Sequence, residues 1–238
     1  MHYPHINLIS GKEESVLMEK QSLPKKAYNA IIDEIVGGAL KLGQPVSQTK
    51  LTKLLKMSRT PLREALFALE KDGIFTRSGR KYSVCYISRR EILELYEIRG
   101  HLEDIGIDMC VENLTPELKR SITVMMKKIR KNTFGEDFDP DVLADLNGKL
   151  HLMIAHGSQN RYMTKFLREI ILKLKIVRVA TLNSTERRVE EFEEHSKIIE
   201  HIMKKEKELA KAAMREHREH VLKFVKDKVF DTLFYYDE

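Results

Sequence analysis

The stretch SRTPLREALFALEKDG, residues 58–73, decides the fold of the N-terminal third of this 238-residue chain. A proline suited to the first turn and Gly73 at the end mark a helix, and three leucines recur on one face at helical spacing. Arg59 and Arg63 lie on another face, at a helix start where the backbone dipole is already positive. A bound anion would offset this electrostatic cost, so the stretch predicts an anion-binding helix.

The net charge of +6 is concentrated around that stretch. Residues 22–88 hold 12 Lys and Arg against 5 Asp and Glu, whereas residues 89–238 hold 28 of each kind. A basic module beside a neutral body is the charge pattern of a protein that binds a polyanion. On charge alone, a solvated basic surface remains the alternative.

Helical periodicity covers most of the chain. Residues 24–40 and 47–57 predict two helices around a turn at 41–46, and residues 74–87 predict a basic β-hairpin after the third helix. This order is that of a winged helix-turn-helix, and the domain border lies near residue 88. Beyond it we expect further helices, near 89–112, 115–133, 139–157, 160–180, 186–204 and 206–230.

Composition restricts the setting of the protein. The chain lacks an apolar run of about 18 residues, which predicts that it has no transmembrane helix. Residues 1–21 lack the apolar core of a signal peptide and predict an N-terminal arm. Two cysteines, Cys85 and Cys110, suit a reducing compartment, so we expect a cytoplasmic protein without membrane contact.

The polar residues at the start of the third helix are candidates for DNA contact. In a helix-turn-helix this helix enters the major groove with its N-terminal residues at the base edges. Arg59 and Arg63 can pair bidentately with guanine or phosphate, and Ser58 and Thr60 can donate hydrogen bonds to phosphate. In the alternative interpretation, Arg63 pairs with an acidic neighbour and Arg59 is merely solvated.

The run SRTPLREALFALEKDGIF resembles the winged helix-turn-helix of the GntR superfamily of bacterial transcription regulators. The preceding GALKLGQPVSQTKLTKLLKM resembles the family's segment before the recognition helix, so the resemblance covers residues 24–87. It implies binding to double-stranded DNA. The family's DNA-contacting positions match Arg59, Thr60 and Arg63 in the recognition helix, Gly79 and Arg80 at the wing tip, and Thr49 or Lys50 in the second helix.

Three of the nine histidines, His151, His195 and His217, lie on apolar stripes of three predicted helices. A buried imidazole needs a hydrogen-bonding partner, and each histidine alone is more often an ordinary core residue. Three that converge in one bundle favour a metal, because imidazole is a ligand of zinc and nickel. Asn147 lies one turn before His151 on the same helical face.

Residues 96–122 resemble the start of the FCD ligand-binding domain of the FadR branch, and the likeness continues to about residue 225. It implies a mainly α protein whose C-terminal part, residues 89–238, is an antiparallel helical bundle for effector binding and dimerisation. Many members hold a divalent metal through an Asp four residues before a His and two later His. Here the matching set is Asn147, His151, His195 and His217. An asparagine brings no charge, so the ion would be held more weakly or completed by an anionic effector or water.

The same resemblance implies that Arg99 holds the carboxylate of a small effector, with Arg178 as a weaker candidate. A helix-surface salt bridge between Arg99 and Glu103 is the alternative. We therefore expect a ligand-responsive regulator with zinc or nickel. By the habit of the family it is a repressor, and it binds a two-fold symmetric operator as a homodimer. A metal-dependent enzyme acting on a small organic acid, with Glu194 as its base, and an effector-independent regulator remain as alternatives.

Overall fold

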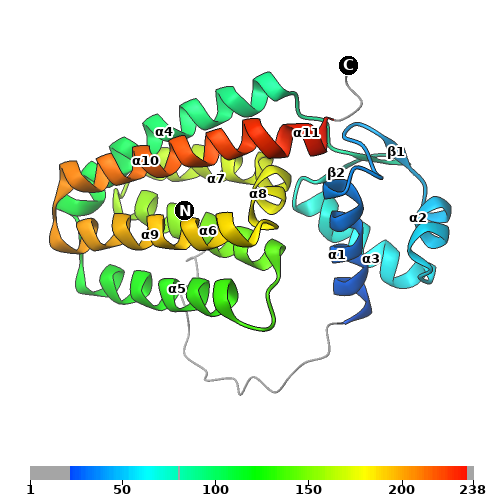
Figure 1. Ribbon diagram of the computed structural model, residues 1–238, viewed down its shortest axis with the longest axis horizontal. Helices are drawn as coiled ribbons and strands as arrows, with labels where there is room; N and C mark the ends of the chain where they lie inside the picture. The colour runs from blue at the N-terminus through cyan, green and yellow to red at the C-terminus, as the bar shows by residue number, and fades with distance from the viewer. Residues whose placement is uncertain (1–21, 80, 235–238) are drawn as a thin grey trace, which may run out of the picture.

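The computed structural model describes residues 22–79 and 81–234 and is mainly helical (Figure 1). A small N-terminal head lies at one end of a longer helical body. The arm predicted at residues 1–21 and the candidate wing residue Arg80 lie outside the described residues. Among the described helices, none is long and apolar enough to cross a membrane.

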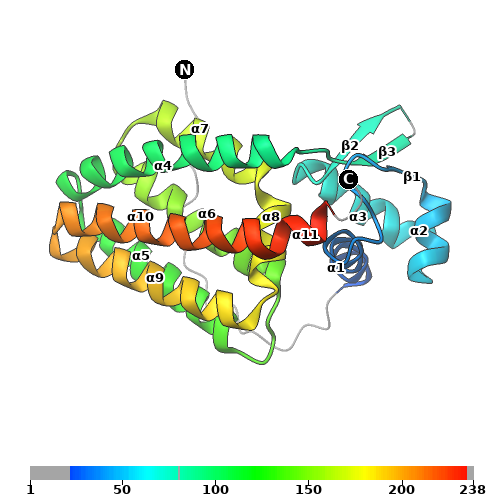
Figure 2. The same cartoon turned by 45° about the horizontal axis from the view of Figure 1, so that its top comes forward.

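The head contains three helices and a three-stranded antiparallel sheet. In chain order its elements are α1 (Leu23–Val36), β1 (Pro45–Val46), α2 (Gln48–Leu55), α3 (Arg59–Lys71), β2 (Phe75–Ser78) and β3 (Lys81–Val84). The apolar faces of α1, α2 and α3 meet in a core that contains Ile31, Leu51, Leu62 and Leu66, each fully buried. Figure 2 shows the β2–β3 hairpin projecting beyond the head helices as a wing.

Two boundaries in the head differ from the sequence prediction. The segment 41–46 is not only a turn, because Pro45 and Val46 pair with Ser83 and Tyr82 as the strand β1. Two residues are too few to show the alternation that predicts a strand. The first helix ends at Val36 instead of Leu40, because Gly38 has a φ of +79°, which a helix cannot continue.

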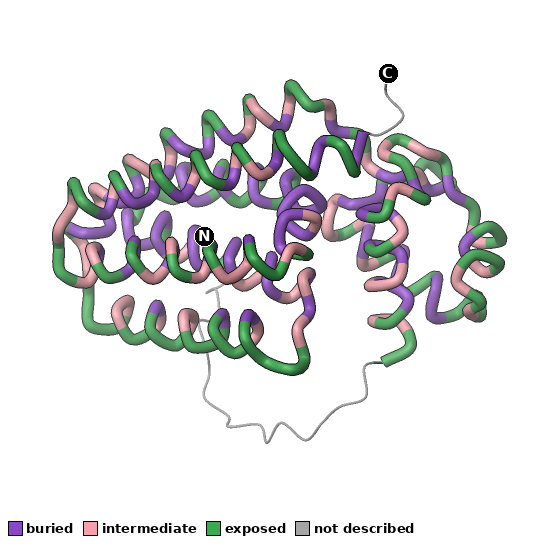
Figure 3. The backbone as a smooth tube through the Cα atoms, in the orientation of Figure 1, coloured by how far each residue is buried: buried purple, intermediate pink, exposed green. Residues whose placement is uncertain are grey.

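The body is an antiparallel bundle of helices around an enclosed core. Its elements are α4 (Arg89–Glu112), α5 (Pro116–Phe134), α6 (Pro140–Gly157), α7 (Arg161–Lys173), α8 (Lys175–Leu182), α9 (Thr185–Lys204), α10 (Lys207–Phe224), a π-helical turn (Val225–Val229) and α11 (Phe230–Leu233). Helix α6 packs against α4, α5, α7 and α8, and α9 packs along α10. Figure 3 shows buried positions on the inward sides of these helices and exposed positions outside.

The sequence prediction of one helix at 160–180 is wrong. The chain bends at Leu174, which has φ −83° and ψ 4°, and separates α7 from α8. Neither glycine nor proline marks this bend, and α8 is buried on nearly all sides, so its sequence shows no polar face that reveals a change of direction. The predicted helix at 206–230 also changes character, because the π-helical turn interrupts it after Phe224.

Head and body meet through buried polar contacts, which we call the head–body cluster and define as Lys25, Tyr28, Asp72, Asp141 and Lys175. Lys175 Nζ lies 2.9 Å from Asp72 of the head and 3.1 Å from Asp141 of the body. Tyr28 donates a hydrogen bond of 2.7 Å to Asp72 and lies 3.1 Å from Asp141, which also pairs with Lys25 at 2.8 Å. The cluster therefore connects α1 and the end of α3 to the starts of α6 and α8.

Candidate functional site

The start of α3 presents the predicted DNA-contacting residues to solvent. Ser58, Arg59, Thr60 and Arg63 are all exposed, while Leu62, Leu66 and Leu69 on the opposite face anchor the helix in the head. Within the described residues, neither arginine forms an ion pair, so the alternative pairing of Arg63 with an acidic neighbour is absent.

Ser58 is the N-cap of α3, but its hydroxyl makes no capping hydrogen bond, unlike Ser47 at the start of α2. The predicted capping bond is therefore wrong. The Ser58 hydroxyl is exposed and available to an external acceptor such as a phosphate.

A surface groove of about 1070 Å³ runs between α2, α3 and the wing. Its lining includes four basic side chains, Lys50, Arg63, Arg77 and Lys81, and only one acidic side chain, Glu64. Lys50, and not its neighbour Thr49, is thus the predicted second-helix residue that lies in this groove. Gly79 at the wing tip has a φ of +59°, and a side chain there would meet open space, which leaves the tip free to approach a ligand.

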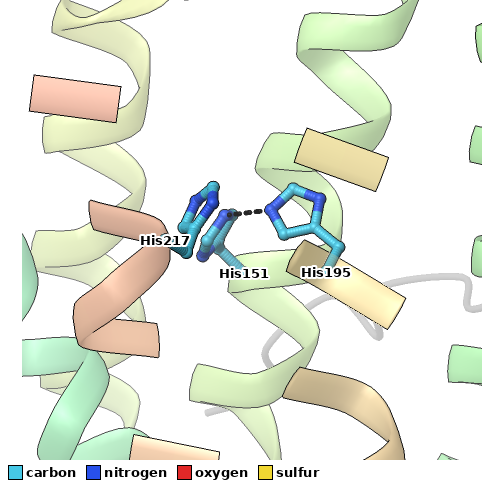
Figure 4. Close-up of side chains that lie close together, drawn as sticks. All are labelled: His151, His195 and His217. Carbon is cyan, nitrogen blue, oxygen red and sulfur yellow. Dashed lines mark hydrogen bonds between the residues drawn. The ribbon is translucent and has the colours of Figure 1, made fainter. Parts of the chain in front are cut away.

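In the body, the three predicted histidines converge from three helices. His151 on α6, His195 on α9 and His217 on α10 are 3%, 1% and 3% exposed, and each offers a ring nitrogen within 4.8 Å of the others. Figure 4 shows the rings facing one another, with His151 Nε2 and His195 Nε2 separated by 3.2 Å. Side chains 22 to 66 residues apart in sequence thus form one compact site, the histidine triad.

Buried carboxylates orient two of these rings. Nδ1 of His151 lies 2.7 Å from Glu103, which also accepts a hydrogen bond of 2.7 Å from Arg99. Nδ1 of His217 lies 2.7 Å from Glu194. A carboxylate at Nδ1 fixes the ring with Nε2 as the free nitrogen, the arrangement that metal-binding histidines usually have.

Glu194 is committed to structure, which argues against the base that the enzyme alternative required. Arg187, which is only 2% exposed, donates hydrogen bonds of 2.9 and 2.6 Å to the two oxygens of Glu194. Burial alone would raise the pKa of Glu194, but hydrogen bonds from His217 and Arg187 outweigh it and lower the pKa to about 2. Such a carboxylate is a weak base at neutral pH.

The environment keeps two imidazoles neutral at pH 7. Burial and the charge of Arg99 lower the pKa of His151 to about 4, although Glu103 acts in the opposite direction. Burial and the neighbouring rings hold the pKa of His195 well below its usual value. Neutral imidazole is the form that binds a metal ion, so the site needs no deprotonation at these two rings.

The geometry of the triad fits a divalent ion. Two imidazole nitrogens bound at about 2.0–2.1 Å to one tetrahedral ion lie about 3.3 Å apart, close to the 3.2 Å between His151 and His195. Asn147 supplies an amide oxygen that is buried and has no hydrogen-bond donor within the described residues. A cation would satisfy that oxygen, so the four predicted ligands lie where one ion can reach them.

A small cavity adjoins the triad. Tyr96, Arg99, Asn147 and Arg178 line it, and its volume of about 10 Å³ admits about one water molecule. Three buried atoms at this cavity have no partner within the described residues, namely Tyr96 Oη, Asn147 Oδ1 and Arg178 Nε. The polar site is ready to receive a small group, but an organic acid enters only if side chains move.

The two predicted effector arginines have different roles in this geometry. Arg99 pairs with Glu103, as the alternative interpretation predicted, and still lines the cavity. The terminal nitrogens of Arg178 donate to the backbone carbonyls of Ala144 and Ile171, so α8 is attached to α6 and α7 through this side chain. Burial and the nearby Arg99 lower the pKa of Arg178 to about 10.

Sequence reasoning missed Glu191, which lies beside the triad. Glu191 is 8% exposed and accepts a hydrogen bond of 2.8 Å from Asn147 Nδ2. It precedes His195 by four residues, the same spacing that joins Asn147 to His151. That spacing was the available signal, but Glu191 lies in the charged run VEEFEEH, where a carboxylate is ordinarily solvated.

A basic winged head on a helical body with an enclosed polar site defines a DNA-binding transcription regulator. Residues 23–82 match the model of the bacterial regulatory proteins of the gntR family, and residues 94–220 match the FCD domain. The chain belongs to the GntR transcription regulators that carry an FCD domain. These regulators are not enzymes, so the expectation of a non-enzymatic protein is confirmed.

Individual relatives agree with this assignment. The chain is 27% identical to the HTH-type transcriptional regulator YdhC of Bacillus subtilis over 81% of its own length and 86% of that protein. It is 27% identical to the gluconate operon transcriptional repressor of Bacillus licheniformis over 46% of each chain. The solved structure of E. coli McbR/YncC shares the fold, with a TM-score of 0.60 and 21% identity over 87% of this chain and 98% of that one.

Proposed function

We propose that this regulator holds one zinc or nickel ion at His151, His195, His217 and Asn147, and that a small carboxylate metabolite binds beside it. The observation that carries the proposal is the convergence of three buried imidazoles whose ligand atoms lie within 4.8 Å of one another. The bound ion would supply positive charge that attracts the carboxylate of the effector. Arg99 and the orphaned Nε of Arg178 would donate hydrogen bonds to it.

Two helices connect this site to the head. Helix α6 carries Asp141 of the head–body cluster and His151, and α8 carries Lys175 of the cluster and Arg178 of the cavity, one turn apart. An acid needs more room than the cavity offers, so its binding displaces Arg178 and with it α8. We propose that this displacement shifts the head through Lys175 and changes how paired heads fit an operator.

DNA binding in this proposal uses the exposed start of α3 and the basic groove. Arg59, Thr60 and Arg63 contact base edges and phosphates of double-stranded DNA, with Ser58 and Lys50 on phosphates. Gly79 and Arg80 of the wing follow the minor groove. Repression is the proposed outcome, and the name of the gluconate operon repressor supports it.

A homodimer is proposed from an apolar surface on α4 and α7. Ile98 and Ile105, seven residues apart on α4, are 53% and 52% exposed, and Tyr162 and Phe166 on α7 are 57% and 50% exposed. These two helices pack against each other, and Figure 2 shows them on one side of the body. Association through this surface would cover it and place two heads on a two-fold symmetric operator. Ile105→Glu is expected to give a monomer in sedimentation velocity, with Lys165→Glu on the exposed surface of α7 as the control.

The test uses a duplex selected from a random pool by the full-length chain. Fluorescence anisotropy measures its dissociation constant while small organic acids are added, with zinc-loaded protein and with chelator-treated protein. At least one acid is expected to change the constant tenfold or more in the loaded protein only. If no acid does so, the second candidate replaces the first: a regulator whose triad is purely structural, which the 10 Å³ cavity favours.

A further inference from the structure

The charge of the candidate metal site depends on a residue outside the ligand set. The four ligands are three imidazoles and the Asn147 amide, and none of these groups carries a negative charge when it binds a metal. A divalent ion buried among neutral ligands is costly, because the surrounding core solvates charge poorly. A carboxylate close to the ligands would lower that cost.

Glu191 is the carboxylate in position to do this. It lines the same cavity as Asn147 and His151, and its Oε1 lies 2.8 Å from Asn147 Nδ2. Within the described residues, Glu191 forms no salt bridge. By contrast, Glu103 and Glu194 pair with Arg99 and Arg187, so the charges of those two carboxylates are already balanced.

The hydrogen bond also decides which atom Asn147 offers. Because a carboxylate only accepts hydrogen bonds, the amide nitrogen of Asn147 must face Glu191. The amide oxygen is then directed elsewhere, and it is buried without a partner within the described residues. Glu191 thereby fixes the amide in the orientation in which Oδ1 is free for a cation.

We infer that Glu191 is a positioning residue of the metal site, which supplies through Asn147 the negative charge that the amide lacks. The inference rests on the proposed metal site. In this chain the carboxylate would lie on α9, four residues before His195, and an amide would lie on α6, four residues before His151. The two helices would share the work of one acidic ligand.

A charge-exchange experiment tests this. Glu191→Gln keeps an acceptor for the Asn147 amide but removes the charge, and Asn147→Asp with Glu191→Gln returns one charge directly to the ligand position. Glu193→Gln removes an exposed carboxylate two residues away on α9 and serves as the control. Isothermal titration with zinc and with nickel gives the dissociation constants, and thermal unfolding of the metal-free proteins verifies that each variant is folded.

Glu191→Gln is expected to weaken zinc binding tenfold or more, the usual effect of losing a group that supports a metal ligand. The double variant is expected to recover to within about threefold of the wild type, and Glu193→Gln to match it. Wild-type affinity in folded Glu191→Gln, or no recovery in the folded double variant, overturns the inference. If the wild type binds neither metal, or if His195→Ala binds as tightly as the wild type, the metal site itself is wrong and the inference fails with it.

Discussion

Lys175 connects the two parts of the molecule, and its removal has a calculable cost. Its side chain is 4% exposed, and its amine lies within 3.1 Å of Asp72, Asp141 and Asp145. Lys175→Met keeps most of the aliphatic stem and deletes the charge. Asp141, whose side chain is 8% exposed, then loses one of its two cationic partners.

Breaking a buried ion pair by removing one partner costs about 3–5 kcal/mol. The lower end applies here, because Lys25 still pairs with Asp141 at 2.8 Å and the side chains of Asp72 and Asp145 are 33% and 44% exposed. We therefore expect Lys175→Met to lower the free energy of unfolding by about 3 kcal/mol.

Urea denaturation followed by circular dichroism measures this difference, with Lys173→Met as the matched control. Lys173 is the neighbouring α7 lysine with an exposed side chain, pairs with Glu91 at 3.2 Å, and is expected to contribute less than about 1 kcal/mol. A Lys175→Met protein within 1 kcal/mol of the wild type would refute the reasoning, because the head–body cluster would then contribute no net stability.

The same pair predicts a pH dependence. Burial would raise the pKa of Asp141, but Lys175 and Lys25 outweigh it and lower the pKa below 3.8, its usual value. A carboxyl group whose pKa is lowered by folding stabilises the folded state above its unfolded pKa, and this contribution is lost as the pH falls through the folded pKa. The stability difference between wild type and Lys175→Met is therefore expected to shrink below about pH 4.

Three further predictions concern the recognition helix, the packing of the body and the triad. Arg59→Ala with Arg63→Ala is expected to weaken duplex DNA binding and to reduce the slope of log affinity against log salt by about 2; an unchanged slope would remove both residues from the interface. Gly157→Ala is expected to cost about 1–3 kcal/mol in thermal unfolding, because the new methyl group would lie 2.6 Å from Cys110 Sγ; an unchanged melting temperature would show that α4 and α6 can separate. Glu194→Gln is expected to weaken zinc affinity about tenfold in a titration, because it loosens the α10 imidazole that it orients, and wild-type affinity would contradict that role.

The strongest sequence predictions came from residues whose role is visible in a local pattern. The leucine row and the flanking cap and glycine placed α3, because one helical face must be apolar to pack. Helical periodicity also placed His151, His195 and His217 inward, which the structure confirms. A buried polar residue on an apolar stripe is conspicuous, so the triad could be found before any coordinates.

What the sequence did not reveal depends on contacts between distant segments. Glu191 and Glu103 lie among other charged residues, and only the packing of α4, α6 and α9 shows that both are buried. The bend at Leu174 follows from how α8 fits between the head and the bundle. Lys175 seemed an ordinary surface lysine, because its three carboxylate partners come from residues 72, 141 and 145.

The metal content of the protein tests the central claim most directly. Equilibrium dialysis of the chelator-treated chain against zinc or nickel, followed by elemental analysis, gives the number of ions per chain for the wild type and for His195→Ala. The account predicts one tightly bound ion per wild-type chain and binding at least about a hundredfold weaker in the variant. No bound ion in the wild type, or equal binding in the variant, would contradict it.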